Sequence, residues 1–220
     1  GQDYLDTAVV CPVVLKDGRP WRHDQYAQSG HYDHMERDLL DIAELGVHVV
    51  RYGMPWRLAE PEPGEYDWSR WDRAFGACAD AGLEPIVDLL HFGLPDHHPR
   101  FADPSWIDGF CRYVDAFAHR YPEPRWFTPV NEPGVTALLT ARYGAWNDRL
   151  ASADDYAQVL ANVVCANLEA MARLRADRDA WWIASEGFDA PVALPMSWRS
   201  MVSIPRRPNN SPPGFWGPIG

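Results

Sequence analysis

Residues 125–133 read Arg-Trp-Phe-Thr-Pro-Val-Asn-Glu-Pro, an apolar run that ends in an amide, a carboxylic acid and a proline. Such a run predicts a buried strand whose last residues emerge at the edge of a sheet, where Asn131 and Glu132 could meet a ligand. A carboxyl group at this position is costly unless it is solvated, paired or used. Loss of hydration also favours its protonated form, which suits a general acid. The competing interpretation is that Asn-Glu-Pro only closes the strand, because Pro133 blocks further pairing.

Outward from this stretch, strand-like and helical segments alternate along the chain. Near-continuous apolar segments predict strands, apolar residues three and four apart predict helices, and Gly46 and Gly82 mark helix ends. The expected strands are residues 7–15, 47–52, 83–90, 125–130 and 181–185; the expected helices are residues 31–45, one from 67 to Gly82, one that starts at 103–104, and a long one that includes 156–174. This alternation predicts an α/β fold in which helices cover a parallel sheet.

Polar side chains follow the apolar strands where the strands end. The second strand ends near Arg51, the third at His91, the fourth at Asn131 and Glu132, and the fifth at Glu186. Because the carboxyl ends of parallel strands meet at one edge of a sheet, we expect these side chains to lie together in a site. Each also has a structural explanation of its own: Arg51 could pair with a surface acid, His91 could be a hydrogen-bonded core residue, and Glu186 could cap a turn.

Composition narrows the class of protein. With 220 residues, of which 46% are hydrophobic, the chain can form one domain with a large core. A net charge of −11 argues against nucleic acid or an anionic membrane as the main partner. The chain has neither a membrane-spanning apolar stretch nor a signal-peptide pattern, so we expect a cytoplasmic protein. The wide spacing of the four cysteines predicts reduced core thiols: Cys11, Cys78, Cys111 and Cys165.

Three motifs resemble the family 1 glycoside hydrolases, which are retaining β-glucosidases and their relatives. They are Val-Arg-Tyr-Gly-Met-Pro-Trp-Arg at residues 50–57, Leu-Leu-His-Phe-Gly-Leu-Pro at 89–95, and Phe-Thr-Pro-Val-Asn-Glu-Pro at 127–133. The resemblance runs from about residue 31 to 189. It implies a TIM-type (β/α)8 barrel and a carbohydrate substrate, with no metal or organic cofactor.

The resemblance also implies roles for individual residues. Glu132 is similar to the general acid/base of the family, and Asn131 to the residue that holds the sugar 2-hydroxyl. His91 resembles a hydroxyl ligand of the sugar subsite, and Arg51 the cation beside the nucleophile. Glycoside hydrolysis needs these types of residue, because one carboxyl group protonates the leaving oxygen while a second carboxylate faces the opposite side of the sugar.

Aromatic residues near the strand ends are candidate surfaces for a pyranose ring. They are Trp56, Phe92, Trp126 and Trp146. Each could equally belong to the core, and we favour the core for any single one. His97 and His98 are adjacent and lack the spacing of helical metal ligands, so we expect a solvated loop and no metal site.

The sequence also departs from the family pattern. Phe92 and Gly93 stand where the family motif has Trp and Asp, and residues 7–15 lack the glutamine of the family's first strand. The family nucleophile follows the seventh strand, whereas this chain has about five β/α units. We therefore expect an incomplete barrel over residues 1–189. The proline-rich residues 190–220 are expected to form an irregular or disordered tail, produced by truncation or a frameshift.

Three functions remain open. The first is a retaining β-glycosidase with Glu132 as acid/base and a nucleophile that this chain lacks. The second pairs Glu132 with Glu186 as the two catalytic carboxylates. The third is an inactive or carbohydrate-binding half-barrel in which Asn131, His91 and the tryptophans still hold a sugar. Uncovered barrel edges would also favour self-association.

Overall fold

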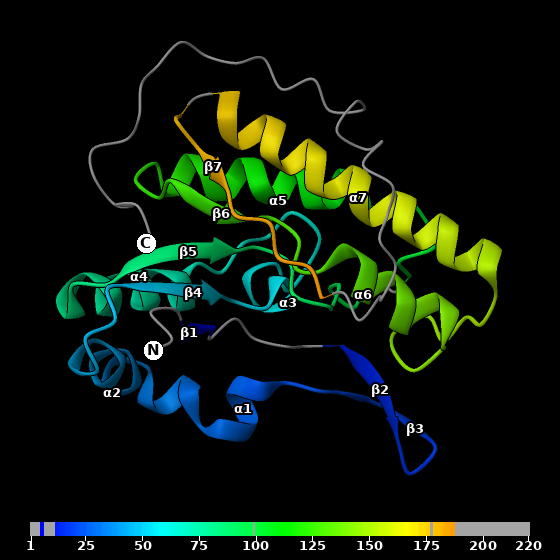
Figure 1. Cartoon of the computed structure of the whole chain (residues 1–220), viewed down its shortest axis with the longest axis horizontal. Helices are drawn as coiled ribbons and strands as arrows, with labels where there is room; N and C mark the ends of the chain where they lie inside the picture. Colours follow the sequence, from blue (N-terminus) through cyan, green and yellow to red (C-terminus); the bar gives the residue numbers. More distant parts are fainter. Residues whose placement is uncertain (1–4, 7–11, 99, 177, 188–220) are drawn as a thin grey trace, which may run out of the picture. The chain divides into compact units, whose positions relative to one another are not determined.

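Five parallel strands form one sheet in the computed structural model of the chain, in the order β1-β4-β5-β6-β7. The structure describes residues 5–6, 12–98, 100–176 and 178–187. The strands are β1 (Leu5–Asp6), β4 (Val49–Gly53), β5 (Glu84–Asp88), β6 (Trp126–Thr128) and β7 (Trp181–Trp182). The arrowheads of β4 and β5 point towards the same end of the molecule in Figure 1. The expected parallel sheet is therefore present, with shorter strands than the apolar runs predicted.

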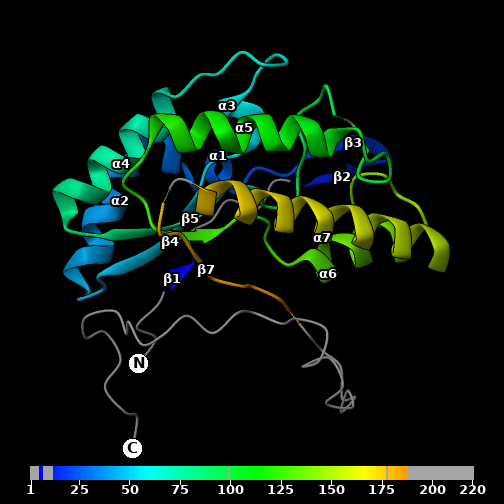
Figure 2. The ribbon, with the colours of Figure 1, turned by 90° about the horizontal axis from the view of Figure 1, so that it is seen from above.

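Helices connect successive strands and gather on one side of the sheet, as Figure 2 shows. The longer ones are α2 (His31–Glu44), α4 (Ser69–Ala81), α5 (Trp106–Arg120) and α7 (Ala153–Ala176). The shorter ones are α1 (Gln25–Ser29), α3 (Trp56–Ala59), α6 (Pro133–Ala137) and the π-helix η1 (Leu138–Arg142). The helix α2 packs on α4, and α5 packs on α7. This is the helix-covered parallel sheet that the strand–helix alternation predicted, and it agrees with the incomplete (β/α) barrel that the family resemblance implied.

The strand register decides which side chains face the helices and which face the barrel interior. Tyr52 is paired with Val87, and Val87 with Phe127, and all three are buried. The alternate positions, among them Arg51 and Asp88, face the other side of the sheet because side chains alternate along a strand. One face of the sheet therefore builds the apolar core, while the other face carries the polar groups.

The strand expected at residues 7–15 was wrong for residues 13–15, which lie outside the barrel sheet. Residues 7–11 lie outside the described residues, and the barrel strand β1 comes earlier, at Leu5–Asp6. The strand β2 (Val13–Lys16) instead forms an antiparallel hairpin with β3 (Arg19–Arg22). Asp17 and Gly18 form the two-residue turn with φ of 52° and 74°. An Asp-Gly pair is a strong hairpin signal, and it could have shown from the sequence that residues 13–22 form a hairpin and not a barrel strand.

The cysteine prediction holds only in part. Cys78 and Cys111 are buried free thiols, whereas Cys165 is exposed on α7, so the prediction of a core thiol is wrong there. Burial raises the pKa of the Cys78 thiol to about 12. Cys11 lies outside the described residues. Cys165 lies on the outer side of α7. The sequence indicated that this segment is helical, but the neighbouring helices decide which face of the helix is packed.

Gly53 provides a test of the sheet geometry, because it is paired with Asp88. A Cβ atom at Gly53 would lie 2.8 Å from the backbone oxygen of Asp88, so the Gly53→Ala substitution must displace backbone. We expect it to lower the free energy of unfolding by about 1–3 kcal/mol, as overpacking does. Chemical denaturation of both proteins measures this difference.

The matched control is Gly76→Ala in α4, where nothing lies within 4 Å of the added Cβ. Alanine there is expected to stabilise the helix by about 0.5–1 kcal/mol. Equal effects of the two substitutions would contradict the close approach of β4 and β5.

Candidate active site

The carboxyl ends of β4, β5 and β6 bring four polar side chains together. Nη1 of Arg51 donates to Oδ1 of Asn131 at 2.5 Å, and Nδ2 of Asn131 lies 3.2 Å from Nε2 of His91. Nδ1 of His91 lies 2.8 Å from Oδ2 of Asp88. Nη1 of Arg51 lies 3.6 Å from the same carboxylate oxygen. We call Arg51, Asn131, His91 and Asp88 the polar ring.

The polar ring is almost closed to solvent. The side chains of Arg51, Asp88 and His91 are 3%, 0% and 7% exposed, and Asn131 is fully buried. Buried charges need partners, and the Arg51–Asp88 pair meets this need at the centre of the ring. Arg51, His91 and Asn131 are therefore held in a single arrangement.

Asp88 was missed by sequence analysis, although a signal existed. It is the last residue of β5 and interrupts the apolar run of residues 83–90. An acid inside an apolar strand is as informative as the acid at residue 132, because its burial has to be compensated. His91 three residues later was the expected site residue, and the register places Asp88 beside Gly53 and Thr128 at the edge of the sheet.

Glu132 directly follows Asn131 of the polar ring in the sequence, and its backbone has an unusual conformation. Its φ of 40° and ψ of 68° lie in the left-handed region, which is uncommon for residues other than glycine and costs about 1–3 kcal/mol. Its N–H donates to the Ser185 carbonyl at 3.1 Å, and its own carbonyl accepts from Thr136. A Cβ at Gly187 would lie 2.9 Å from Oε2 of Glu132, so the half-buried Glu132 side chain lies against that glycine.

Glu186 is placed at the start of α6. Its two carboxylate oxygens accept from the N–H groups of Gly134 at 2.9 Å and Val135 at 3.3 Å. A carboxylate at a helix N-terminus satisfies free N–H groups and interacts well with the helix dipole. Glu186 thus supports the segment that follows Glu132, and its pairing with Glu132 in catalysis stays a hypothesis.

Two of the aromatic candidates for sugar binding, Trp56 and Trp126, lie away from the polar ring. Trp56 is 1% exposed, donates to Oε2 of Glu60 at 2.6 Å and stacks between the rings of His98 and Tyr113. It therefore lies in the core and does not present a free ring face. Trp126 begins β6 and donates to Glu84 at the start of β5, so it lies at the opposite end of the sheet.

Trp146 is the aromatic candidate that extends from the polar ring. It is half-buried and packs on Phe92 at 4.9 Å between ring centroids, and Phe92 packs on His91 at 4.5 Å. Phe92 also has a positive φ of 66°. This aromatic row forms a wall beside His91.

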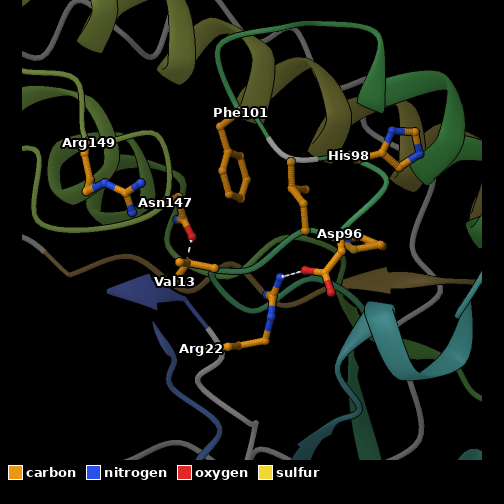
Figure 3. A pocket seen from close by; sticks show the side chains of 9 residues that line it. Val13, Arg22, Asp96, His98, Phe101, Asn147 and Arg149 are labelled. Atoms are coloured by element: carbon orange, nitrogen blue, oxygen red, sulfur yellow. Dashed lines mark hydrogen bonds and ion pairs between the residues drawn. The ribbon is translucent and has the colours of Figure 1, made fainter. Parts of the chain in front are cut away.

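A small pocket lies between the β2–β3 hairpin and the loops after β5 and η1 (Figure 3). Asn147 joins these parts, since its backbone N–H and its side-chain oxygen contact Val13, and its amide nitrogen donates to the Phe92 carbonyl. Figure 3 shows Arg22 and Asp96 facing each other, and these form an ion pair at 2.5 Å. The pocket holds about 180 Å³, less than the ~300–1,000 Å³ usual for ligand sites.

Neither a metal centre nor a membrane span is present in the described part of the chain. No group of three or more His, Cys, Asp or Glu side chains among residues 5–6, 12–98, 100–176 and 178–187 could hold a metal ion. His98 lies among aromatic rings, and burial lowers its pKa. No helix within the same ranges is long and apolar enough to cross a membrane.

Known proteins resemble this chain in sequence over part of their length. It is 32% identical to a 6-phospho-beta-glucosidase of Dickeya chrysanthemi over 108 residues, which are 44% of this chain and 23% of the relative. It is 26% identical to a coniferin beta-glucosidase of Pinus contorta over 151 residues, 63% of this chain and 28% of the relative. The chain thus spans less than a third of the length of these relatives.

Solved structures share the fold. A beta-glucosidase from Thermotoga maritima in complex with castanospermine matches with a TM-score of 0.70 and 18% identity, over 81% of this chain and 47% of that one. The same enzyme in complex with glucoimidazole matches with a TM-score of 0.64 and 22% identity, over 69% and 37%. The family model of glycosyl hydrolase family 1 matches residues 20–201. Because this match covers most of the chain, the chain belongs to glycosyl hydrolase family 1.

Proposed function

We propose that this chain forms the acid/base side of a β-glycosidase site, in which Glu132 protonates the leaving oxygen of a β-glucoside. The observation that carries the proposal is the position of Glu132, directly after the polar ring at the carboxyl ends of the strands. Its strained backbone conformation supports it, because such strain clusters at functional sites. The names of the relatives, a 6-phospho-beta-glucosidase and a coniferin beta-glucosidase, favour a β-glucoside as the substrate.

In this proposal the polar ring and the aromatic row bind the sugar. His91 and Asn131 hold hydroxyl groups without adding charge, and Trp146 offers a ring face. Asn131 is fully buried, and both ends of its amide are engaged, so a sugar hydroxyl has to enter between Asn131 and His91. Arg51 keeps its positive charge beside the position of a second carboxylate, which favours the ionised form of that carboxylate.

A retaining mechanism requires a second carboxylate about 5–5.5 Å from the proton donor. We propose that a carboxylate outside the described residues fills this role. Glu186 is the alternative within them, but both of its oxygens accept from the start of α6. Using Glu186 as a nucleophile would leave those N–H groups without their acceptor.

A second candidate function is carbohydrate binding without hydrolysis. The observation that favours it is the closed polar ring, in which the amide of Asn131 is satisfied by protein groups. Under this hypothesis the aromatic row and His91 bind a sugar weakly, and no second carboxylate is needed.

Glu132→Gln tests the proton donor. The amide cannot protonate the leaving oxygen, so hydrolysis of an aryl β-glucoside by the purified chain is expected to fall about 10²–10⁴-fold. Glu123→Gln is the matched control, because Glu123 is exposed in the loop before the amino end of β6 and should leave the rate unchanged. Unchanged hydrolysis by Glu132→Gln would refute its role. Sugar binding by the unmodified chain without any turnover would favour the second candidate function.

The Glu186→Gln substitution tests whether Glu186 only supports α6 or also takes part in catalysis. If Glu186 only caps α6, the substitution lowers the free energy of unfolding by up to about 1 kcal/mol, as for a carboxylate at a helix N-terminus, and leaves hydrolysis intact. A loss of hydrolysis as large as that of Glu132→Gln, with unchanged stability, would instead assign the second carboxylate to Glu186. Unfolding curves and initial rates on the same samples give both values.

A further inference from the structure

The polar ring determines its own hydrogen-bond directions, because Arg51 can only donate. The oxygen of the Asn131 amide must therefore face Arg51, at the 2.5 Å contact. The nitrogen of that amide then faces His91, at 3.2 Å from Nε2. Because an amide nitrogen donates and does not accept, Nε2 of His91 must be the acceptor.

The acceptor role of Nε2 decides the protonation of His91. A ring nitrogen that accepts carries no hydrogen, so His91 is neutral and its hydrogen is on Nδ1. Nδ1 lies 2.8 Å from Oδ2 of Asp88, and an ionised carboxylate only accepts. All contacts of the polar ring thus agree with a single pattern, which runs from Arg51 through Asn131 and His91 to Asp88.

Burial of the Asp88 carboxylate in this position costs free energy. Its side chain is 0% exposed, and Oδ1 has no hydrogen-bond partner among the residues that the structure describes. Arg51 at 3.6 Å from Oδ2 balances its charge, so the pair is neutral before His91 is counted. A carboxylate nevertheless offers what an amide cannot, because the amide of an asparagine could either accept from or donate to Nδ1.

We propose that Asp88 is a positioning residue that holds His91 in the Nδ1–H tautomer, so that Nε2 meets the substrate only as an acceptor. The proposal rests on the proposed function, in which His91 binds a sugar hydroxyl. It restricts the chemistry of that contact: the hydroxyl at Nε2 donates its hydrogen. Asp88 itself touches no substrate and acts through His91, as second-layer carboxylates do for other histidines.

The chain contains a matched internal control. His31 contacts Asp38 through Nδ1 at 2.6 Å and the hydroxyl of Tyr52 through Nε2 at 2.8 Å. His31 and Asp38 both lie on α2, and the contact of His31 with Tyr52 joins this helix to β4; none of the three residues belongs to the polar ring. Asp38→Ala therefore removes the same kind of contact as Asp88→Ala without touching the site.

The first experiment is long-range ¹H–¹⁵N NMR of the full chain labelled in its eight histidine rings, with His91 assigned by its loss in His91→Gln. We expect His91 of the unmodified chain as the neutral Nδ1–H tautomer at pH 7. Asp88→Ala should move it towards the Nε2–H form and leave His31 unchanged, and Asp38→Ala should do the reverse. An Nε2–H or doubly protonated His91 in the unmodified chain overturns the proposal, even if the variants do not fold. An unaltered His91 in a folded Asp88→Ala variant also overturns it.

The second experiment measures the affinity for castanospermine by calorimetry. Asp88→Ala should weaken binding about tenfold, because one buried contact of His91 is lost, and Asp38→Ala should bind as the unmodified chain does. Asp88→Asn keeps the shape and one acceptor, so it should recover part of the affinity. Equal binding by Asp88→Ala and the unmodified chain contradicts a positioning role. If the unmodified chain does not bind, the proposed function fails, while the tautomer is still decided by NMR.

Discussion

The buried ion pair between Arg51 and Asp88 is the constraint on which the functional end of the sheet depends. Neither charge has appreciable solvent exposure, and the two lie 3.6 Å apart on neighbouring strands. Because removing one partner would leave an uncompensated buried charge, the pair ties the ends of β4 and β5 to one register. That register also requires Gly53, which leaves room for the backbone of Asp88.

The loops after the strands are organised around this pair. Asn131 closes the polar ring from the end of β6, and its backbone N–H also donates to the Leu90 carbonyl. Glu132 then turns into the left-handed region, and two glycines make space for the neighbouring acids: Gly187 for Glu132, and Gly134 for Glu186. The loop after β6 and the segment after β7 therefore support each other, which holds a strained residue at the mouth of the barrel.

Much of the fold could be predicted because its signals are local. Apolar runs and helical spacing located the parallel sheet and the helices, whereas three motifs, at residues 50–57, 89–95 and 127–133, carried the family resemblance. The fold class and the family are confirmed. The strand expected at residues 7–15 was wrong for residues 13–15, because these belong to β2, which an Asp-Gly turn joins to β3 in a hairpin outside the barrel sheet. Trp56 was chosen for its place beside a strand end, but its ring is buried by His98 and Tyr113. The roles proposed for Glu132 and Glu186 stay predictions.

By itself, the sequence determined the types of residue at the strand ends and the order of the strands, because both follow from periodicity along the chain. Only the tertiary structure decided which of those residues contact one another. It brought Asp88 beneath His91, directed Asn131 between Arg51 and His91, and assigned the Glu186 carboxylate to the start of α6. The reason is that hydrogen bonds between the strand ends depend on register and loop geometry. Residues 40 to 80 positions apart, such as Asn131 with His91 and with Arg51, carry no mark of that pairing in their order.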